Sequence, residues 1–288
     1  MSESGRVLVT GGTGNTGRRV AALLAAAGHP VRAVSRRPEG GPAGVAGFET
    51  GRFDWDDTAT HAPVLEGVGR LYLVPPTAAP DPAAHLIPFL DRARRAGVER
   101  VVLLASSAIA ETDGGLGEVY GAIRERFAQW AVLQPSWFMQ NFTGDHPHAH
   151  GVRAYDEIVT AAGDGRIAFV DADDIAEVGA RALTDEHPHN TAHLITGPRA
   201  LSYADVAEVI SRVAGRPVRH RAVSGATMRD RLASTGMPVR FAELLAGMDE
   251  AIAAGAEDRT SPAVERVTGR APRSFADFAA AHADAWRR

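Results

Sequence analysis

The chain has 288 residues, a formal net charge of −4 and no cysteine. None of its 31 basic residues is a lysine, so all of them are arginines. Without cysteine there is no disulfide, thiolate nucleophile or sulfur-ligated metal, and without lysine there is no Schiff base, P-loop lysine or Tyr-x-x-x-Lys dehydrogenase pair. The small negative charge gives no reason to expect nucleic acid as a partner.

The start of the chain predicts a soluble, cytoplasmic protein. A strand is expected from residue 6, which leaves no room for a signal peptide, and the apolar stretch 20–28 is too short to cross a bilayer. We therefore expect no membrane partner, and a monomer or a homodimer.

The first half of the chain alternates short β-branched runs with amphipathic stretches, the pattern of βαβ units and a parallel sheet. Strands are expected at residues 6–10, 31–35, 48–53, 70–74, 101–105 and 131–133, and helices at 14–28 and 83–97. A Gly- and Pro-rich loop, residues 38–47, separates the second and third strands. The sequence therefore predicts an α/β fold, with a Rossmann-type doubly wound parallel sheet over residues 1–145.

After Asn141 the pattern changes, and we predict a smaller α/β substrate lobe over residues 146–288, with a part near 190–197 returning to the sheet. We expect a polar loop at 146–150, helices at 154–162, 173–184 and 202–214, strands at 167–170 and 192–196, and short helices up to residue 286. Ser202 and Asp205 have the spacing of a capping box, with Asp in the usual place of Glu.

Three glycines at intervals of three, Gly11, Gly14 and Gly17, lie between the first strand and the first helix. The first permits a tight turn, the second lets the backbone approach a pyrophosphate, and the third lets the helix lie close to the strand. Free N–H groups at the helix start attract phosphates. The loop therefore predicts a dinucleotide site that also includes Thr13, Asn15 and Thr16.

The end of the second strand indicates which dinucleotide binds. It reads Ser35-Arg36-Arg37, with no carboxylate before Glu39. NAD-selective sites place a carboxylate there for the ribose 2′-OH, whereas a 2′-phosphate needs cations. We predict that Arg36 and Arg37 bind the 2′-phosphate of NADP(H), with a solvated surface pair as the alternative. Asp54 and Trp55, after the third strand, are predicted to meet the adenine.

The order and spacing of several segments resemble the NmrA-like branch of the atypical short-chain dehydrogenases/reductases, and within it the ergot-alkaloid reductases and their bacterial relatives. The segments are LVTGGTGNTGRRV (8–20), FDWDD (53–57), LYLVPP (71–76), AGVERVVLLASSA (96–108), LQPSWFMQNF (133–142), VDADDIAEVGARALTD (170–185) and ITGPRALSYADVAEVIS (195–211). The resemblance implies a substrate cleft between the sheet and a smaller C-terminal lobe. It places the nicotinamide near Val74, Pro75, Pro76, Ser106, Ser107 and the segment 133–141, which includes Pro135.

Short-chain reductases commonly use a Ser, a Tyr and a Lys as a proton-transfer group. Here Ser107 precedes Tyr120 by thirteen residues, and residue 124 is an arginine. Tyr120 can donate a proton to a carbonyl oxygen while Arg124 stabilises the phenolate, but an arginine with a pKa above about 12 is a poor proton relay. The alternatives are that Tyr120 is a partly buried helix-start residue, and that an electron-poor acceptor needs positioning alone.

An aromatic segment after the sixth strand can form a flat apolar wall for such an acceptor, with core packing as the alternative for at least half of it. The predicted substrate residues are Trp137, Phe138, Asn141, Phe142, His146 and Tyr155, with Met139 beside them.

Two clusters of polar residues resemble metal or paired-carboxylate sites but are not interpreted as such. His146, His148 and His150 alternate in sequence but lack a nearby carboxylate, so we predict no metal. Asp171, Asp173 and Asp174 are interpreted as acidic residues at a helix start.

The sequence therefore predicts an NADP(H)-dependent oxidoreductase that transfers hydride to an electron-poor, hydrophobic small molecule, such as an iminium, a quinone or an activated C=C or C=O, in secondary metabolism. Two alternatives stay open. The first is an NAD(P)-binding regulator or redox sensor without catalysis, since the resembling family includes such members. The second is a cofactor-binding enzyme that performs a redox-neutral cyclisation or isomerisation.

Overall fold

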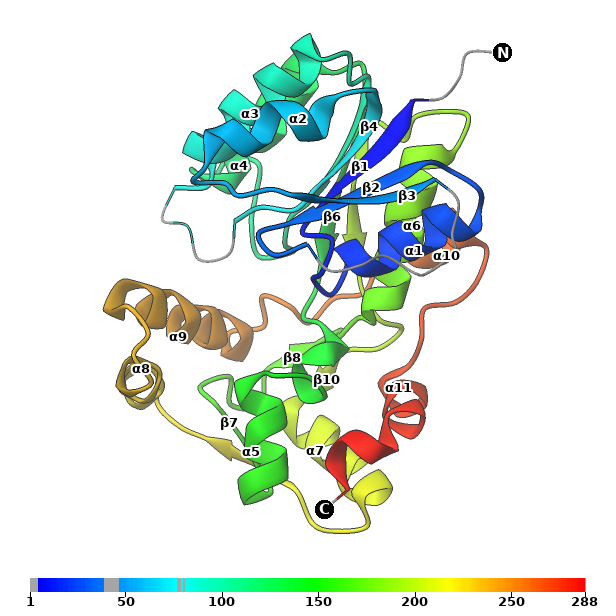
Figure 1. Ribbon diagram of the computed structural model, residues 1–288. Coiled ribbons are helices and arrows are strands. Elements are labelled where there is room, and N and C mark those ends of the chain that lie inside the picture. Colours follow the sequence, from blue (N-terminus) through cyan, green and yellow to red (C-terminus); the bar gives the residue numbers. More distant parts are fainter. Residues whose placement is uncertain (1–4, 39–46, 77–78, 80, 288) are drawn as a thin grey trace. The chain divides into compact units, whose positions relative to one another are not determined.

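The computed structural model describes residues 5–38, 47–76, 79 and 81–287 (Figure 1). The described residues form two compact units, the first drawn from residues 1–135 and 172–194 and the second from residues 136–171 and 195–288. The predicted boundary after residue 145 therefore falls inside the second unit. The loop predicted at 38–47 lies almost entirely outside the described residues.

The first unit is built on a seven-stranded parallel sheet in the order β3-β2-β1-β4-β5-β6-β9. The strands are β1 (Arg6–Thr10), β2 (Val31–Ser35), β3 (Phe48–Arg52), β4 (Val68–Leu73), β5 (Arg100–Leu104), β6 (Gln129–Pro135) and β9 (Thr191–Ile195). The strand order reverses between β1 and β4, and such switch points are where α/β sheets bind ligands, at the carboxyl ends of the strands.

Helices cover both faces of this sheet, as a doubly wound fold requires. On one face α1 (Gly17–Ala26) and α6 (Ala172–Thr184) pack against each other, and on the other lie α3 (Ala83–Arg95) and α4 (Leu116–Arg126) (Figure 1). The short elements η1 (Thr58–Thr60) and α2 (His61–Leu65) precede β4. The prediction of a Rossmann-type α/β fold is confirmed. Because both faces are covered, side chains such as Leu8, Leu71 and Leu103 are fully buried.

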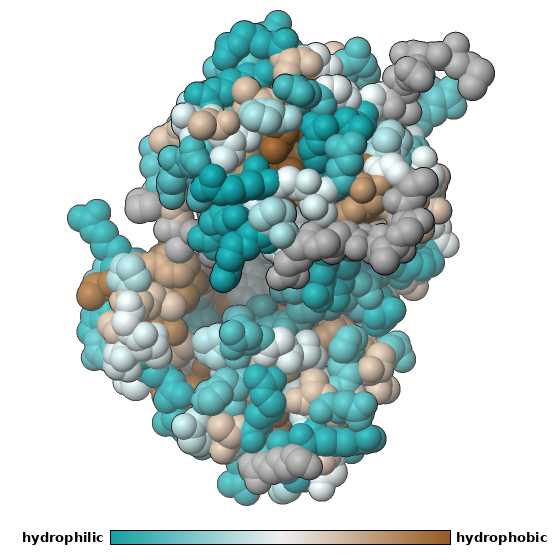
Figure 2. Space-filling view, in the orientation of Figure 1, coloured by the Kyte–Doolittle hydropathy of each residue, from teal (hydrophilic) through white to brown (hydrophobic). Residues whose placement is uncertain are grey.

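The second unit combines two small sheets with helices. β7 (Glu157–Thr160) pairs in parallel with β11 (Arg219–Ala222), and β8 (Arg166–Ile167) pairs antiparallel with β10 (Leu201–Ser202). Its helical elements are η2 (Met139–Phe142), α5 (Pro147–Tyr155), α7 (Tyr203–Ala214), α8 (Gly225–Ser234), α9 (Val239–Ala253), α10 (Ala263–Thr268), α11 (Phe275–Ala281) and η3 (Ala283–Trp286). Val239 and Leu244 of α9 are exposed, and Figure 2 shows apolar surface over this helix.

The start of the second unit differs from the sequence prediction. The polar loop expected at 146–150 is the beginning of α5, because Pro147 suits the first helical position and His146 Nδ1 accepts a hydrogen bond from the His148 N–H at 3.2 Å. The helix expected at 154–162 is wrong as well. Asp156 ends α5 in a left-handed conformation, and the β-branched residues that follow form β7.

The capping box predicted at the start of α7 is confirmed. The Ser202 hydroxyl accepts from the Asp205 N–H at 3.1 Å, and the Asp205 carboxylate accepts from the Ser202 N–H at 2.9 Å. The hydrogen bond from the Ser202 backbone lowers the pKa of Asp205.

Candidate dinucleotide site and substrate residues

The glycine loop leads directly from β1 into α1. Gly11 has a φ of +62°, a left-handed conformation that glycine adopts without strain. A Cβ on Gly17 would lie 2.2 Å from the Gly11 carbonyl oxygen, so only glycine lets the helix begin this close to the loop. Thr13, Gly14 and Asn15 are exposed at the tip, whereas the Thr16 side chain is buried.

The backbone of this loop fits a phosphate group. In the part of the chain that the structure describes, no carbonyl accepts a hydrogen bond from the N–H groups of Asn15, Thr16 or Gly17, and no side chain caps α1. Unsatisfied donors at the start of a ten-residue helix, together with the positive end of its dipole, favour an anion there. The loop can therefore hold the pyrophosphate of a dinucleotide.

Arg36 and Arg37 follow β2 and are exposed. The Ser35 hydroxyl donates to the Arg37 carbonyl at 2.7 Å, which holds the turn after the strand. The Gly12 N–H donates to the Val34 carbonyl at 2.9 Å, so this end of β2 lies against the glycine loop. Neither guanidinium has an ion-pair partner among the described residues. Two uncommitted cations near a phosphate-binding loop are what a 2′-phosphate requires.

Asp54 and Trp55 lie after β3 and are partly exposed. One carboxylate oxygen of Asp54 accepts from the Asp56 N–H at 3.2 Å, and the indole packs edge-on against Phe53 and Phe89. These contacts hold the turn after β3 in place. That Asp54 and Trp55 meet the adenine stays a prediction.

Thr10, which the sequence analysis did not single out, joins β1 to β4 at the switch point. Its side chain is fully buried, and its hydroxyl accepts from the Val74 N–H at 2.7 Å. Val74 in turn lies against Gly11, where an added Cβ would come within 3.1 Å of the valine side chain. Pro75 and Pro76 follow, partly buried. A threonine that ends a strand gives no signal in one sequence, because its partner lies 64 positions away.

Residues at the ends of β5 and β6 come together at the same edge of the sheet. The Ser107 N–H donates to the Pro135 carbonyl at 3.0 Å, and the Ser106 hydroxyl accepts from the Ala108 N–H at 3.2 Å. Because these strands run parallel to β1 and β4, Ser106, Ser107 and Pro135 share an edge with the glycine loop and Val74.

Tyr120 and Arg124, the predicted proton-transfer pair, have other partners. Tyr120 on α4 is 3% exposed within the apolar core, and its hydroxyl donates to the Ile109 carbonyl at 3.4 Å. Burial raises the pKa of this phenol. The half-exposed Arg124 guanidinium pairs with Glu111. The arrangement is that of a buried helix tyrosine, with the cation committed to a carboxylate.

The substrate residues predicted in the second unit fall into two groups. Phe142 follows the core-packing alternative, because its ring is fully buried and packs edge-on against Phe169 and Phe275, with centroids 5.4 Å and 5.3 Å away. Met139 is likewise buried. Trp137 and Phe138 are partly exposed and stay candidates.

Of the polar candidates of this unit, His146 and Asn141 are in contact, whereas Tyr155 lies at the other end of α5. His146 caps α5, and burial lowers its pKa to about 4, partly offset by a hydrogen bond with the Asn141 backbone. Asn141 is partly exposed in η2. Tyr155 is 64% exposed at the end of α5, with its ring 5.8 Å from that of His150.

The described ranges contain no group of three or more His, Asp or Glu side chains placed to hold a metal ion. No helix within them is long and apolar enough to cross a membrane. Asp173 and Asp174 lie in the first turn of α6, as interpreted from the sequence. Asp171 is fully buried and accepts hydrogen bonds from Gln140 at 2.7 Å and Arg273 at 2.6 Å.

A parallel sheet with a glycine loop at its switch point defines a Rossmann-type dinucleotide-binding protein. A family model described as NAD(P)H-binding matches residues 11–186, and the model of the NmrA-like family matches residues 118–279. The chain therefore belongs to the NmrA-like family of NAD(P)H-binding proteins.

Similarity to individual proteins extends over nearly the whole chain. It is 43% identical over 286 residues to the uncharacterized oxidoreductase YesF of Bacillus subtilis (strain 168), covering 99% of this chain and 98% of YesF. It is 37% identical over 289 residues to an agroclavine dehydrogenase of Claviceps fusiformis, covering 97% and 98%. A Citrobacter sp. triphenylmethane reductase complexed with NADP(H) shares the fold, with a TM-score of 0.77, 24% identity and coverage of 95% and 99%. The chain is an NAD(P)H-dependent oxidoreductase.

Proposed function

We propose that the protein is an NADPH-dependent reductase of electron-poor, hydrophobic small molecules, such as an iminium, a quinone or an activated C=C or C=O. One observation carries the proposal. Among the described residues, the carboxyl edge of the sheet holds a dinucleotide-binding loop and two uncommitted arginines, whereas the only phenol–arginine pair suggested by the sequence is occupied elsewhere.

Different residues bind different parts of the dinucleotide. The N–H groups of the glycine loop hold the pyrophosphate, and Arg36 and Arg37 hold the 2′-phosphate. Val74, Ser107 and Pro135 orient the nicotinamide end at the same edge. When bound, the reduced nicotinamide supplies the hydride.

The acceptor should be electrophilic before it binds, because the predicted acid pair is engaged elsewhere, Tyr120 with the Ile109 carbonyl and Arg124 with Glu111. Holding two reactants together supplies much of the rate by effective molarity, and this needs only shape and apolar surface. Trp137 and Phe138 are the partly exposed aromatic residues that offer such surface. The similarity to an agroclavine dehydrogenase supports a small organic substrate. We expect the enzyme to act in the cytoplasm as a monomer or homodimer.

The test is NADPH oxidation, followed by absorbance, with a panel of quinones, cyclic iminiums and enones. We expect turnover with at least one class. Tight NADPH binding without turnover of any member would instead support the regulator, and product formation without a change in NADPH absorbance would support a redox-neutral enzyme.

A further inference from the structure

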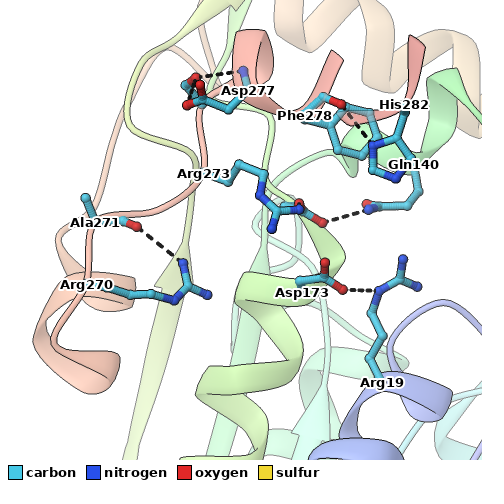
Figure 3. A network of polar contacts seen from close by, with 11 residues as sticks. Arg19, Gln140, Asp173, Arg270, Ala271, Arg273, Asp277, Phe278 and His282 are labelled. Atoms are coloured by element: carbon cyan, nitrogen blue, oxygen red, sulfur yellow. Dashed lines mark hydrogen bonds and ion pairs between the residues drawn. The ribbon is translucent and has the colours of Figure 1, made fainter. Parts of the chain in front are cut away.

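Arg19, on the first turn of α1, connects the glycine loop to a distant helix of the same unit. Its Nη1 donates to the Asn15 carbonyl at 2.8 Å, and its Nε donates to the carboxylate of Asp173 in the first turn of α6 (Figure 3). The Arg19 side chain is only 18% exposed, and that of Asp173 is 47% exposed. One guanidinium thus fixes a loop carbonyl and is itself held by a carboxylate 154 residues away.

The Asn15 carbonyl has no backbone partner in the described part of the chain, so the guanidinium takes the place of a helical N–H. The peptide group between Asn15 and Thr16 is planar and trans, so its C=O and N–H point in opposite directions. When Arg19 holds the carbonyl toward the helix, the Thr16 N–H is turned away from the helix body. That N–H is one of the unsatisfied donors of the phosphate site.

We propose that Arg19 and Asp173 are positioning residues for the dinucleotide, which set the orientation of the Asn15–Thr16 peptide and so aim its N–H at the pyrophosphate. The inference rests on the proposed placement of the pyrophosphate at the glycine loop. Neither side chain needs to touch the cofactor. The fork of arginine is required, because a lysine ammonium lacks two donors in a fixed plane for two acceptors.

The direction in which one substitution changes NADPH affinity distinguishes this positioning role from a simple effect of charge. Asp173→Asn removes a negative charge near a predicted phosphate site. If charge alone mattered, NADPH would bind more tightly to this variant. If Asp173 acts by holding Arg19, both NADPH and NADH bind more weakly, because both carry the pyrophosphate.

The chain offers a matched control. Arg126 on α4 has the same two kinds of contact, with its Nε donating to Asp91 at 2.7 Å and its Nη1 donating to the Ala122 carbonyl, also four residues earlier, at 3.1 Å. Its Nη1 also lies 3.6 Å from the exposed Glu125 carboxylate. This pair is on α3 and α4, away from the glycine loop in the fold of the first unit (Figure 1). Asp91→Asn and Arg126→Lys therefore report the general effect of losing a half-buried ion pair.

The experiment is calorimetric titration of the intact protein with NADPH and with NADH. We expect Asp173→Asn and Arg19→Lys each to raise both dissociation constants by about 5- to 10-fold, leaving their ratio unchanged, and the double variant to be no weaker than Arg19→Lys. Asp91→Asn and Arg126→Lys should leave both constants within about 2-fold while lowering the melting temperature to a similar degree.

Tighter or unchanged binding by Asp173→Asn, or a loss confined to NADPH, would overturn the proposal. The dissociation constants are read without turnover. A protein that reduces none of the acceptors therefore still gives this test a clear outcome, and the two proposals can fail separately.

Discussion

At the scale of single residues, Arg36 and Arg37 are the side chains proposed to select NADPH over NADH. Both are exposed and lack an ion-pair partner among the described residues, so neither is needed for the fold. We expect Arg36→Ala combined with Arg37→Ala to weaken NADPH binding by about 100-fold, as loss of two charge-assisted contacts predicts, and NADH binding by less than about 3-fold. Equal losses for the two cofactors, measured by titration, would exclude the 2′-phosphate assignment.

Substitution of Tyr120 tests whether hydride transfer needs a proton donor from α4. In Tyr120→Phe the Ile109 carbonyl keeps a second donor, the Gln134 side chain at 3.2 Å, so we expect the free energy of unfolding to change by less than about 1 kcal/mol. Turnover of an iminium or quinone should stay within about 2-fold of the wild type, because positioning supplies the rate. If turnover instead falls by about 100-fold or more while KM is unchanged, Tyr120 is the acid after all.

Thr10 shows how one buried hydroxyl sets the geometry of a binding edge. Thr10→Val keeps the shape of the side chain but leaves the partly buried Val74 N–H without its acceptor, which costs about 1–3 kcal/mol of stability. Because Val74 lies against Gly11, we also expect NADPH to bind about 10-fold more weakly. Denaturation and titration measure the two effects. Thr10→Ser, which retains the hydroxyl, should recover most of both.

At the scale of elements, α5 makes the second unit sensitive to acid. The His148 ring stacks on Phe142 at 5.5 Å and lies 4.8 Å from that of His146 and 5.4 Å from that of Tyr203. Burial is the main cause that lowers the pKa of His148 to about 3 and that of His146 to about 4, and it also lowers the pKa of the neighbouring His220.

Because these pKa values are lowered in the folded state, the direction in which stability changes with pH is determined. From about one pH unit above 6.5 upward, the histidines are neutral in both the folded and the unfolded state and contribute no pH dependence. As the pH falls below 6.5, the unfolded chain binds protons that the folded chain excludes, so stability decreases by up to about 1.4 kcal/mol per pH unit for each group until its folded pKa is reached. We expect His148→Phe, which keeps a ring on Phe142, to flatten the decrease of stability between pH 6.5 and 4. An unchanged slope in His148→Phe, measured by denaturation at several pH values, would contradict this account.

At the scale of the whole molecule, the sequence predicted the first unit better than the second, and the reason is physical. Strands covered on both faces appear as unbroken β-branched runs, so β1 and β2 have the predicted bounds. The short strands of the second unit depend on distant partners, as β7 does on β11, so the few β-branched residues of β7 did not distinguish it from the helix predicted at 154–162. The glycine loop can be predicted from the sequence because its function requires glycines at a local spacing. The contact of Arg19 with Asp173 cannot, because it forms only when the chain folds.

The division into two units leads to a prediction about cofactor binding and stability. The glycine loop, Arg36, Arg37 and Val74 all belong to the first unit. NADPH at 100 times its dissociation constant should raise the free energy of unfolding of that unit by about 2.7 kcal/mol, since only the folded loop binds it. Amides of β1 and β4 that exchange by unfolding should then exchange about 100-fold more slowly, whereas amides of β7 and α7 should change less.

Hydrogen exchange followed by mass spectrometry measures both sets of amides in one experiment. Equal protection in the two units would mean that they unfold together or that the second also binds the cofactor. The control that ties the effect to this site is Arg36→Ala with Arg37→Ala. At an unchanged NADPH concentration, its roughly 100-fold weaker binding should reduce the slowing of exchange from about 100-fold to about 2-fold.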